Sequence, residues 1–397
     1  MTAAMDVPGL QRALAEQGLD GWLLYDFHGQ NPTAVAALGL GGHMLTRRWF
    51  YLVPARGEPH LLVHAIEQGS FPAEVPGRRE GYASWASLRE ALGRMLAALP
   101  PRAKVAMEYY PLAAIPALSR VDAGTIELVR GYGVEVVPSG ALVQRFLCRW
   151  DDAQVESHVR ALRAIDAAKD AAFAKVGQAL ARGETLLETD VQAFLMKRFA
   201  EAGLETDHAP IVAVNGHAAD PHYTPSDRTP TPIRRGDLLL VDLWARGKGP
   251  RDVYADITWV ASCGEPSARF RQVFDVVSGA RDLGLATVER AHREGRTLEG
   301  WEVDRAVRDF VAAKGFGERF VHRTGHSIGT SVHGDGANLD DLETHDTRPL
   351  VPGLAFSIEP GVYLPDEGIG VRCEIDVFLA ADGPKVFAPI QREIVRI

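Results

Sequence analysis

Cysteine is scarce in this sequence, and its placement excludes two kinds of site. Only Cys148, Cys263 and Cys373 occur in 397 residues, far apart and without a Cys-x-x-Cys spacing. Such usage gives neither a disulfide framework nor a cysteine-based zinc site, and it favours a reducing cytoplasm.

A net positive charge and long apolar runs are also missing. The formal net charge is −9, so a concentrated basic surface for nucleic acid is not expected. No uncharged apolar run approaches the ~20 residues that cross a bilayer, so no membrane partner is expected. The first ten residues, MTAAMDVPGL, lack the basic and apolar segments of a secretory signal, which predicts an unexported, cytoplasmic protein.

Length and composition predict a folded protein of two domains. The chain is 46% hydrophobic and 24% charged, as in ordinary globular proteins, and 397 residues exceed what one core usually supports. Up to about residue 148 strand-like and helix-like patterns alternate: LQRALAEQGLDGWLLYDF reads as helix then strand, and RWFYLVPARGEPHLLVHA as two strands. This part of the chain predicts a small α/β domain.

The pattern changes near residue 150, where a long amphipathic helix begins. Apolar residues recur at intervals of three or four through RWDDAQVESHVRALRAIDAAKDAAFAKVGQAL, with Asp151 or Asp152 as its cap. A second helix is predicted after Thr185, whose spacing to Glu188 matches a capping box. Two more helices are predicted from near Ser267 and Trp301.

Four strand-like runs each contain a carboxylate: Asp242 in DLLLVDLWA, Asp256 in DVYADITWVA, Glu359 in LAFSIEPGVYL and Glu374 in VRCEIDVFLA. Burying an ionised carboxylate costs several kcal/mol unless charge or hydrogen bonds replace water. One such residue alone is ordinarily a salt-bridged or edge-strand acid. Four of them, with the histidine-bearing loop HRTGHSIGTSVHGDG between the second and third, favour a shared divalent cation. Oxygen ligands with one imidazole suit Mn²⁺, with Zn²⁺ or Co²⁺ as alternatives.

Turn-forming connectors predict that these strands pair two by two. RGKGPR separates the first two runs and PDEGIG separates the last two, which predicts two hairpins. Asp242 and Asp256 are then expected to face the same side. Asp252 is an alternative to Asp256, but it adjoins the turn.

A family resemblance rests on five residues in order: Asp242, Asp256, His326, Glu359 and Glu374, in the contexts VDLWA, YADIT, GHSIG, SIEPGVY and RCEID. This set resembles the metal ligands of the pita-bread-fold metallopeptidases, which include methionine aminopeptidase, aminopeptidase P and prolidase. One departure is that the connector between the two aspartates is longer than the usual hairpin of that group.

The resemblance implies a fold for nearly the whole chain. It predicts an α+β protein in which a C-terminal pita-bread metallopeptidase domain, residues 149–397, follows a smaller α/β domain of the creatinase/prolidase type, residues 1–148. The resemblance also suggests a homodimer.

The resemblance further implies that the five side chains bind two divalent ions. Asp256 and Glu374 would bridge the ions, Asp242 would bind one, and His326 and Glu359 would bind the other. Two such ions can hold a bridging hydroxide and polarise a carbonyl, which is the equipment of an amide hydrolase. Glu359 would carry a proton from the attacking water to the leaving nitrogen.

Three further histidines match pocket positions of the family. His322 and His333 would line the substrate pocket, where one of them can hydrogen-bond a developing oxyanion, although His322 could also simply pack beside the site. His222, followed by a tyrosine, matches the pocket histidine that precedes the first aspartate strand. His217 is expected to be an ordinary polar loop residue.

Two residues are expected to support the ligands from the same strand faces. Arg372, two residues before Glu374, is expected to orient a carboxylate or a pocket tyrosine. Thr258, two residues after Asp256, is expected to hydrogen-bond that aspartate.

The favoured activity is that of an Xaa-Pro dipeptidase, a prolidase. Methionine aminopeptidase usually lacks such an N-terminal domain, and creatinase needs no metal set. The alternatives are an Xaa-Pro aminopeptidase acting on longer peptides and a noncatalytic peptide-binding module on the same fold. Arg47 and Arg48 are candidates to recognise the proline carboxylate, acting across a dimer, with a solvated basic pair as the alternative.

Overall fold

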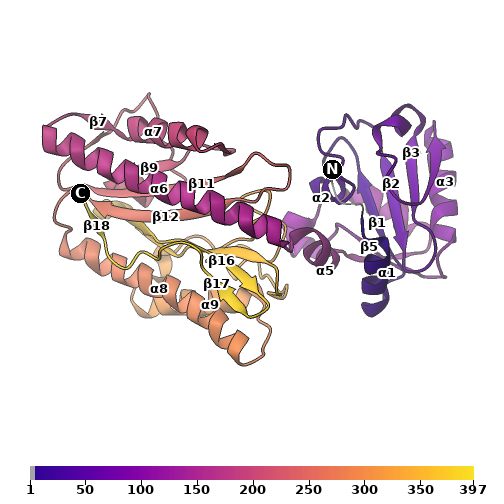
Figure 1. Cartoon of the computed structure of the whole chain (residues 1–397). Coiled ribbons are helices and arrows are strands. Elements are labelled where there is room, and N and C mark those ends of the chain that lie inside the picture. The colour runs from indigo at the N-terminus through magenta and orange to yellow at the C-terminus, as the bar shows by residue number, and fades with distance from the viewer. Residues whose placement is uncertain (1–4) are drawn as a thin grey trace. The chain divides into compact units, whose positions relative to one another are not determined.

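The computed structural model describes residues 5–397, and the contacts divide them into two units, one ending at Leu147 and the next beginning at Cys148 (Figure 1). The first four residues, part of the segment expected to lack an export signal, lie outside the described residues. Across residues 5–397, no helix has the length and apolar character needed to span a bilayer.

The N-terminal unit is a six-stranded sheet with helices, as the alternating pattern predicts. The strand order is β4-β3-β2-β1-β5-β6, and β2 runs antiparallel to both of its neighbours. The apolar sides of α1, α3 and α4 follow the expected helical period. The elements are β1 (Gly21–Asp26), β2 (Trp49–Pro54), β3 (His60–His64), β4 (Arg78–Tyr82), β5 (Lys104–Met107), β6 (Glu135–Pro138), α1 (Val7–Glu16), α2 (Pro32–Ala37), α3 (Trp85–Ala97), α4 (Ala123–Arg130) and α5 (Gly140–Val143).

The C-terminal unit combines four long helices with several short sheets. The helices are α6 (Asp152–Arg182), α7 (Glu188–Glu201), α8 (Ala268–Arg293) and α9 (Gly300–Ala313). Its first strands are β7 (Leu186–Leu187), β8 (Leu204–Glu205), β9 (Ile211–Val214), β10 (Pro232–Ile233), β11 (Leu238–Gly247) and β12 (Ala255–Ser262). Its last strands are β13 (Ala355–Ile358), β14 (Gly361–Leu364), β15 (Ile369–Arg372), β16 (Ile375–Ala380), β17 (Gly383–Lys385) and β18 (Val395–Arg396).

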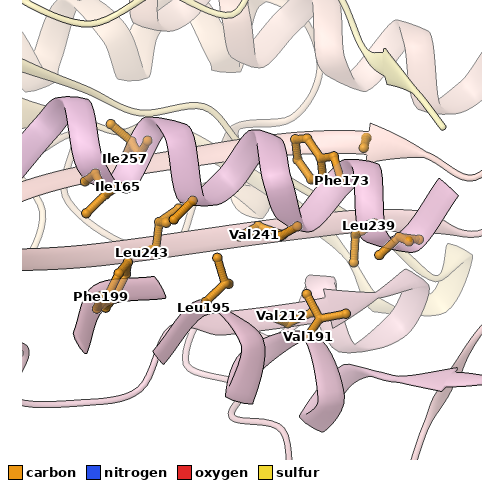
Figure 2. Close-up of a cluster of buried hydrophobic side chains, with 14 of the residues drawn as sticks. Ile165, Phe173, Val191, Leu195, Phe199, Val212, Leu239, Val241, Leu243 and Ile257 are labelled. Carbon is orange, nitrogen blue, oxygen red and sulfur yellow. The ribbon is translucent and has the colours of Figure 1, made fainter. Parts of the chain in front are cut away.

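The sheet around β11 and β12 is covered on both faces. Alternate residues of β11 point to opposite sides, so Leu239 and Val241 join a core with α6 and α7, whereas Leu240 joins a core with α8 and α9. Figure 1 shows these helix pairs on either side of the two long strands. The first core is drawn in Figure 2 and includes Ile165, Phe173, Val191, Leu195, Phe199, Val212, Leu243 and Ile257.

The predicted helix starts are largely confirmed, with one error. The Asp151 carboxylate accepts a hydrogen bond from the Gln154 amide at 2.9 Å, which caps α6 as predicted. The predicted capping box of Thr185 and Glu188 is wrong, because Glu188 is the first residue of α7. Its carboxylate turns into the interior, where it accepts from the Val214 amide at 2.7 Å.

The two predicted C-terminal strands are each broken in the middle. LAFSIEPGVYL forms β13 and β14, and VRCEIDVFLA contains the end of β15 and then β16. The predicted hairpin exists in two parts, since β13 pairs with β16 and β14 pairs with β15. Pro360 has no N–H to donate to a ladder, and the Glu374 amide donates to the carbonyl of Thr258 on β12 at 3.2 Å. The breaks therefore fall beside the two glutamates.

Candidate metal centre

Strands β11 and β12 bring two aspartates to one face of their sheet. In the antiparallel register Asp242 lies opposite Thr258, and Asp256 lies opposite Trp244. Side chains at these paired positions point to the same side, so Asp242 and Asp256 are diagonal neighbours, as expected from the hairpin. Both are buried, at 8% and 4% exposure.

The loop that contains His326 approaches the broken strand end that contains Glu359. The His326 amide donates to the Ser357 hydroxyl at 3.0 Å, and the Glu359 amide donates to the Thr324 carbonyl at 2.7 Å. These bonds place His326 Nε2 at 3.2 Å from Glu359 Oε1 and at 3.7 Å from Asp256 Oδ2.

Glycine is required at position 325 for this approach. A Cβ on Gly325 would lie 1.9 Å from the Ser357 carbonyl oxygen, whereas a Cβ on Gly329 would meet nothing within 4 Å. Contact with the Ser357 backbone thus explains why glycine precedes His326.

His326 presents Nε2 to the acidic cluster. Burial, followed by the nearby His333, holds the pKa of His326 well below its usual range, so the ring is neutral. With Nδ1 at 3.2 Å from the Ser327 carbonyl, a proton on Nδ1 leaves the Nε2 lone pair free for a metal.

The cluster has the properties of a cation site. Asp256, His326 and Glu374 each offer one ligand atom, and these atoms lie within 4.8 Å of one another. Asp256 Oδ1 and Glu374 Oε1 are buried and have no hydrogen-bond partner within residues 5–397. Burial and then neighbouring carboxylates raise the pKa values of both acids well above the usual range. A divalent cation would satisfy both oxygens and remove the repulsion, so these donors fit a metal ion.

Glu359 combines ligand geometry with a proton affinity suited to neutral pH. Its Oε1 accepts from the Ser357 hydroxyl at 3.2 Å, and its side chain is 16% exposed. Burial raises the pKa of Glu359 to about 7. Such a carboxyl exchanges a proton readily under physiological conditions.

Arg372 contacts several site residues at once. Its guanidinium donates to Asp242 Oδ2, to the Tyr363 hydroxyl at 2.9 Å and to the Thr258 hydroxyl at 3.2 Å. It therefore contacts both a carboxylate and a tyrosine.

The expectation that Thr258 supports Asp256 is wrong. The Thr258 hydroxyl donates to Glu374 Oε2 at 2.7 Å, because β15 and β16 pass beside β12 and bring Glu374 to this position. Asp256 is instead held through its own amide, which donates to Asp376 at 2.8 Å.

The three pocket histidines differ in their surroundings. His322 is fixed at both nitrogens, with Nε2 at 2.7 Å from the Tyr363 hydroxyl and Nδ1 at 2.8 Å from the Arg323 carbonyl. Burial lowers the pKa of His322 to about 3, so this ring is neutral. His333 stands edge-on to His326 with ring centroids 4.3 Å apart, and His222 is exposed.

One cavity of about 650 Å³ gathers the five predicted metal ligands, the three predicted pocket histidines and Arg372. Its lining also contains residues that the sequence did not single out. Arg323 is the most notable, because it forms no ion pair with a carboxylate among the described residues; its position between His322 and His326 was the available signal. The full lining is Asp207, His208, Ile211, Asp220, Pro221, His222, Asp242, Trp244, Asp256, Val321, His322, Arg323, His326, Val332, His333, Glu343, Glu359, Arg372 and Glu374.

Other candidates lie apart from this cavity. His217 bonds to Glu188 at 3.1 Å and stacks on Tyr223, so it is more than an ordinary loop residue. Arg47 and Arg48 belong to the N-terminal unit, where they line a separate cavity, and their role at the substrate stays a prediction.

Comparison with known proteins identifies the family. The model of metallopeptidase family M24 matches residues 160–381. The chain belongs to this family. The M24 segment contains the two ligand hairpins and the histidine loop described above.

Relatives and solved structures agree with this membership. The chain is 37% identical over 228 residues to the probable dipeptidase PepE of Mycobacterium tuberculosis strain H37Rv, covering 57% of this chain and 56% of that protein. It is 31% identical over 242 residues to the Xaa-Pro dipeptidase of Lactobacillus delbrueckii subsp. lactis, covering 61% of each. The match thus spans somewhat more than half the length of these curated relatives. The structure of dipeptidase PepE from Mycobacterium ulcerans superimposes with a TM-score of 0.74 at 25% identity, covering 98% of this chain and 96% of that one.

The superposition with PepE covers nearly the whole of this chain and confirms the predicted fold class. A smaller α/β domain precedes a C-terminal pita-bread domain.

Proposed function

We propose that this chain is an Xaa-Pro dipeptidase, which hydrolyses the imide bond of dipeptides ending in proline. The observation that carries the proposal is the buried cluster of carboxylates and one neutral imidazole, with two unpartnered oxygens, on the wall of a cavity. The relatives named PepE dipeptidase and Xaa-Pro dipeptidase support the same class of reaction.

The proposed metal ligands, which would hold two divalent ions, are Asp242, Asp256, His326, Glu359 and Glu374. When bound, such ions activate water and polarise the scissile carbonyl. The proposal also includes Mn²⁺ as the native ion, a cytoplasmic location and a homodimer. These three points come from the sequence and the family resemblance.

Glu359 is the proposed proton carrier. Its carboxylate lies in the cavity beside the other proposed ligands, where it can accept the proton of the attacking water and then donate it to the imide nitrogen as the bond breaks. Proline leaves as a secondary amine, so this proton is needed to complete cleavage.

His333 is the proposed hydrogen-bonding histidine for the substrate, whereas both ring nitrogens of His322 are already bonded within the protein. The Tyr363 hydroxyl lies between His322 Nε2 and the Arg372 guanidinium. Because Arg372 donates to that oxygen, the phenol is free to donate its proton to His322. His333, beside His326, faces the cavity and can donate to an oxygen on which negative charge develops.

Arg323 is the proposed anchor for the proline carboxylate. It lines the cavity, it has no carboxylate partner among the described residues, and a guanidinium binds a carboxylate in a bidentate fashion. Ile211, Trp244 and Val332 supply apolar wall for a pyrrolidine ring, which has no N–H to satisfy. A dipeptide ending in proline offers Arg323 a free carboxylate. A longer peptide has an amide at that position, so this contact would distinguish the two.

A peptide-length series tests the proposal. Ala-Pro and Ala-Pro-Ala would be assayed after EDTA treatment and reloading with Mn²⁺, Zn²⁺ or Co²⁺. We expect Ala-Pro to be cleaved and the tripeptide to be poor, with the preference reduced in Arg323→Gln. Preferred cleavage of the tripeptide would support an Xaa-Pro aminopeptidase. Metal uptake without cleavage of either peptide would support a noncatalytic binding module.

A further inference from the structure

A long loop between β9 and β10, residues 215–231, forms one wall of the cavity. It contributes Asp220, Pro221 and His222 to the lining. Apart from one turn of 3₁₀ helix, Asn215–Ala219, the loop has no regular structure of its own. A loop of this length keeps one shape through the contacts of its side chains, both within the loop and with residues outside it.

Glu188, the first residue of α7, joins the two ends of this loop. Its carboxylate accepts from the amide of Val214, directly before the loop, at 2.7 Å. Its own amide donates to the carbonyl of Thr231, the last loop residue, at 3.0 Å. One residue therefore closes the loop at its base.

The same carboxylate also holds the middle of the loop. The Tyr223 hydroxyl donates to Glu188 Oε2 at 2.5 Å, and His217 Nδ1 lies 3.1 Å from both carboxylate oxygens. The rings of His217 and Tyr223 stack with centroids 4.1 Å apart and planes 20° apart. Tyr223 directly follows His222, so the bond to Glu188 fixes the backbone that carries the cavity histidine.

The start of the loop also packs against β15, the strand that ends at Arg372. A Cβ on Gly370 would lie 1.8 Å from the Ala218 carbonyl oxygen, so backbone meets backbone there. The loop is thus held both by Glu188 and by an adjoining strand of the metal centre.

Glu188 is 1% exposed and does not belong to the cavity lining. A buried carboxylate is costly unless its hydrogen bonds replace water, and here every bond it accepts comes from this loop or its base. The hydrogen bonds that offset the cost of burying the Glu188 carboxylate are therefore the same bonds that fix the loop.

We propose that Glu188 is a positioning residue for the substrate pocket, which acts through Tyr223 to hold His222 against the bound peptide. The inference rests on the proposed dipeptidase function. It predicts an effect on substrate affinity, since the loop forms a wall of the pocket and contributes no metal ligand.

Two conservative variants separate positioning from folding. Glu188→Gln keeps the volume and one oxygen for Val214 but places an amide against the Tyr223 phenol. Tyr223→Phe removes only the hydroxyl and keeps the ring on His217. Tyr132→Phe is the matched control, since that hydroxyl donates to the Arg89 carbonyl at 2.7 Å in the other unit.

The first readout is kinetic, with Ala-Pro and metal-loaded enzyme. Glu188→Gln and Tyr223→Phe are expected to raise KM about five-fold to ten-fold, the effect of one lost charge-assisted hydrogen bond, with kcat within about two-fold. Tyr132→Phe is expected to leave both constants unchanged. In a His222→Ala background the two variants should raise KM no further, because the residue through which they act is gone. A rise in KM that persists in that background would overturn the proposal.

The second readout needs no activity. Amide hydrogen exchange in residues 215–223 is expected to quicken in Glu188→Gln and Tyr223→Phe, and to stay unchanged in Tyr132→Phe. Unchanged exchange in the two test variants would refute the positioning role. If no Xaa-Pro dipeptide is cleaved under any loading condition, the dipeptidase proposal fails, and exchange still decides whether Glu188 holds the loop.

Discussion

His158 makes the stability of the C-terminal unit depend on pH in a defined window. The residue lies on α6, 1% exposed, with Nδ1 at 2.9 Å from the Tyr254 carbonyl and its ring 5.0 Å from that of Trp150. Burial lowers the pKa of His158 to about 4. Asp376 Oδ2, at 3.8 Å, offers little compensation, because burial raises the pKa of that carboxyl well above its usual range.

The direction of the effect follows from the two pKa values of His158. The unfolded chain binds the proton below its ordinary pKa of 6.5, whereas the folded chain binds it only below about 4. The contribution to stability is therefore complete above pH 6.5 and is lost as the pH falls towards 4. Between pH 7.5 and pH 4.5 the loss is about 2.5 kcal/mol, at 1.36 kcal/mol per pKa unit.

The measurement compares wild type with His158→Gln, whose amide can still donate to Tyr254. The free energy of unfolding would be taken from denaturant titrations of EDTA-treated protein at pH 7.5 and pH 4.5. We expect the pH-dependent loss to be about 2.5 kcal/mol smaller in the variant. His43→Gln, which changes an exposed histidine of the other unit, should behave like wild type. Equal losses in wild type and His158→Gln would refute the reasoning.

Three further predictions concern the metal centre. Gly325→Ala is expected to destabilise the protein by about 1–3 kcal/mol and to reduce metal uptake. Gly329→Ala, which has open space for its Cβ, should do neither. Equal thermal stability of the two variants would contradict the steric argument. Arg372→Met removes the donor to Asp242 and is expected to weaken metal binding about 10-fold to 100-fold by calorimetry, and unchanged affinity would show that the contact is dispensable. Glu359→Gln is expected to lower kcat by about 100-fold or more in steady-state assays even at saturating metal, and retained kcat would exclude it as the proton carrier.

Local periodicity predicted part of the arrangement around the site, whereas the ligand set itself came from the family resemblance and stays a prediction. The alternation of strand side chains placed Asp242 and Asp256 on one face, because a short hairpin leaves few other pairings. The neighbourhood of His326 was predictable from the glycines and serines around it. The long helix α6 and its cap followed from a period of three to four residues and one aspartate.

The errors arise where the decisive partner is distant in the chain. Thr258 was assigned to the aspartate two residues before it, but its partner Glu374 lies in the break between β15 and β16, more than a hundred residues later. Glu188 fitted a capping box by spacing alone, and its real partners are Val214 at the end of β9 and Tyr223 in the loop that follows. The strand breaks beside Glu359 and Glu374 interrupt apolar runs that continue in the sequence, so hydropathy gave no sign of them.

The strand breaks at Glu359 and Glu374 keep these two proposed ligands outside the ladders that hold the fold together. Because β13–β16 and β14–β15 pair on either side of the two glutamates, removing either carboxylate leaves these ladders complete and relieves crowding between like charges. A single substitution of Glu359 or Glu374 would therefore remove a proposed catalytic group and leave the strand pairing around it intact. The same property makes the scaffold a convenient starting point for engineering a peptide receptor without hydrolytic activity.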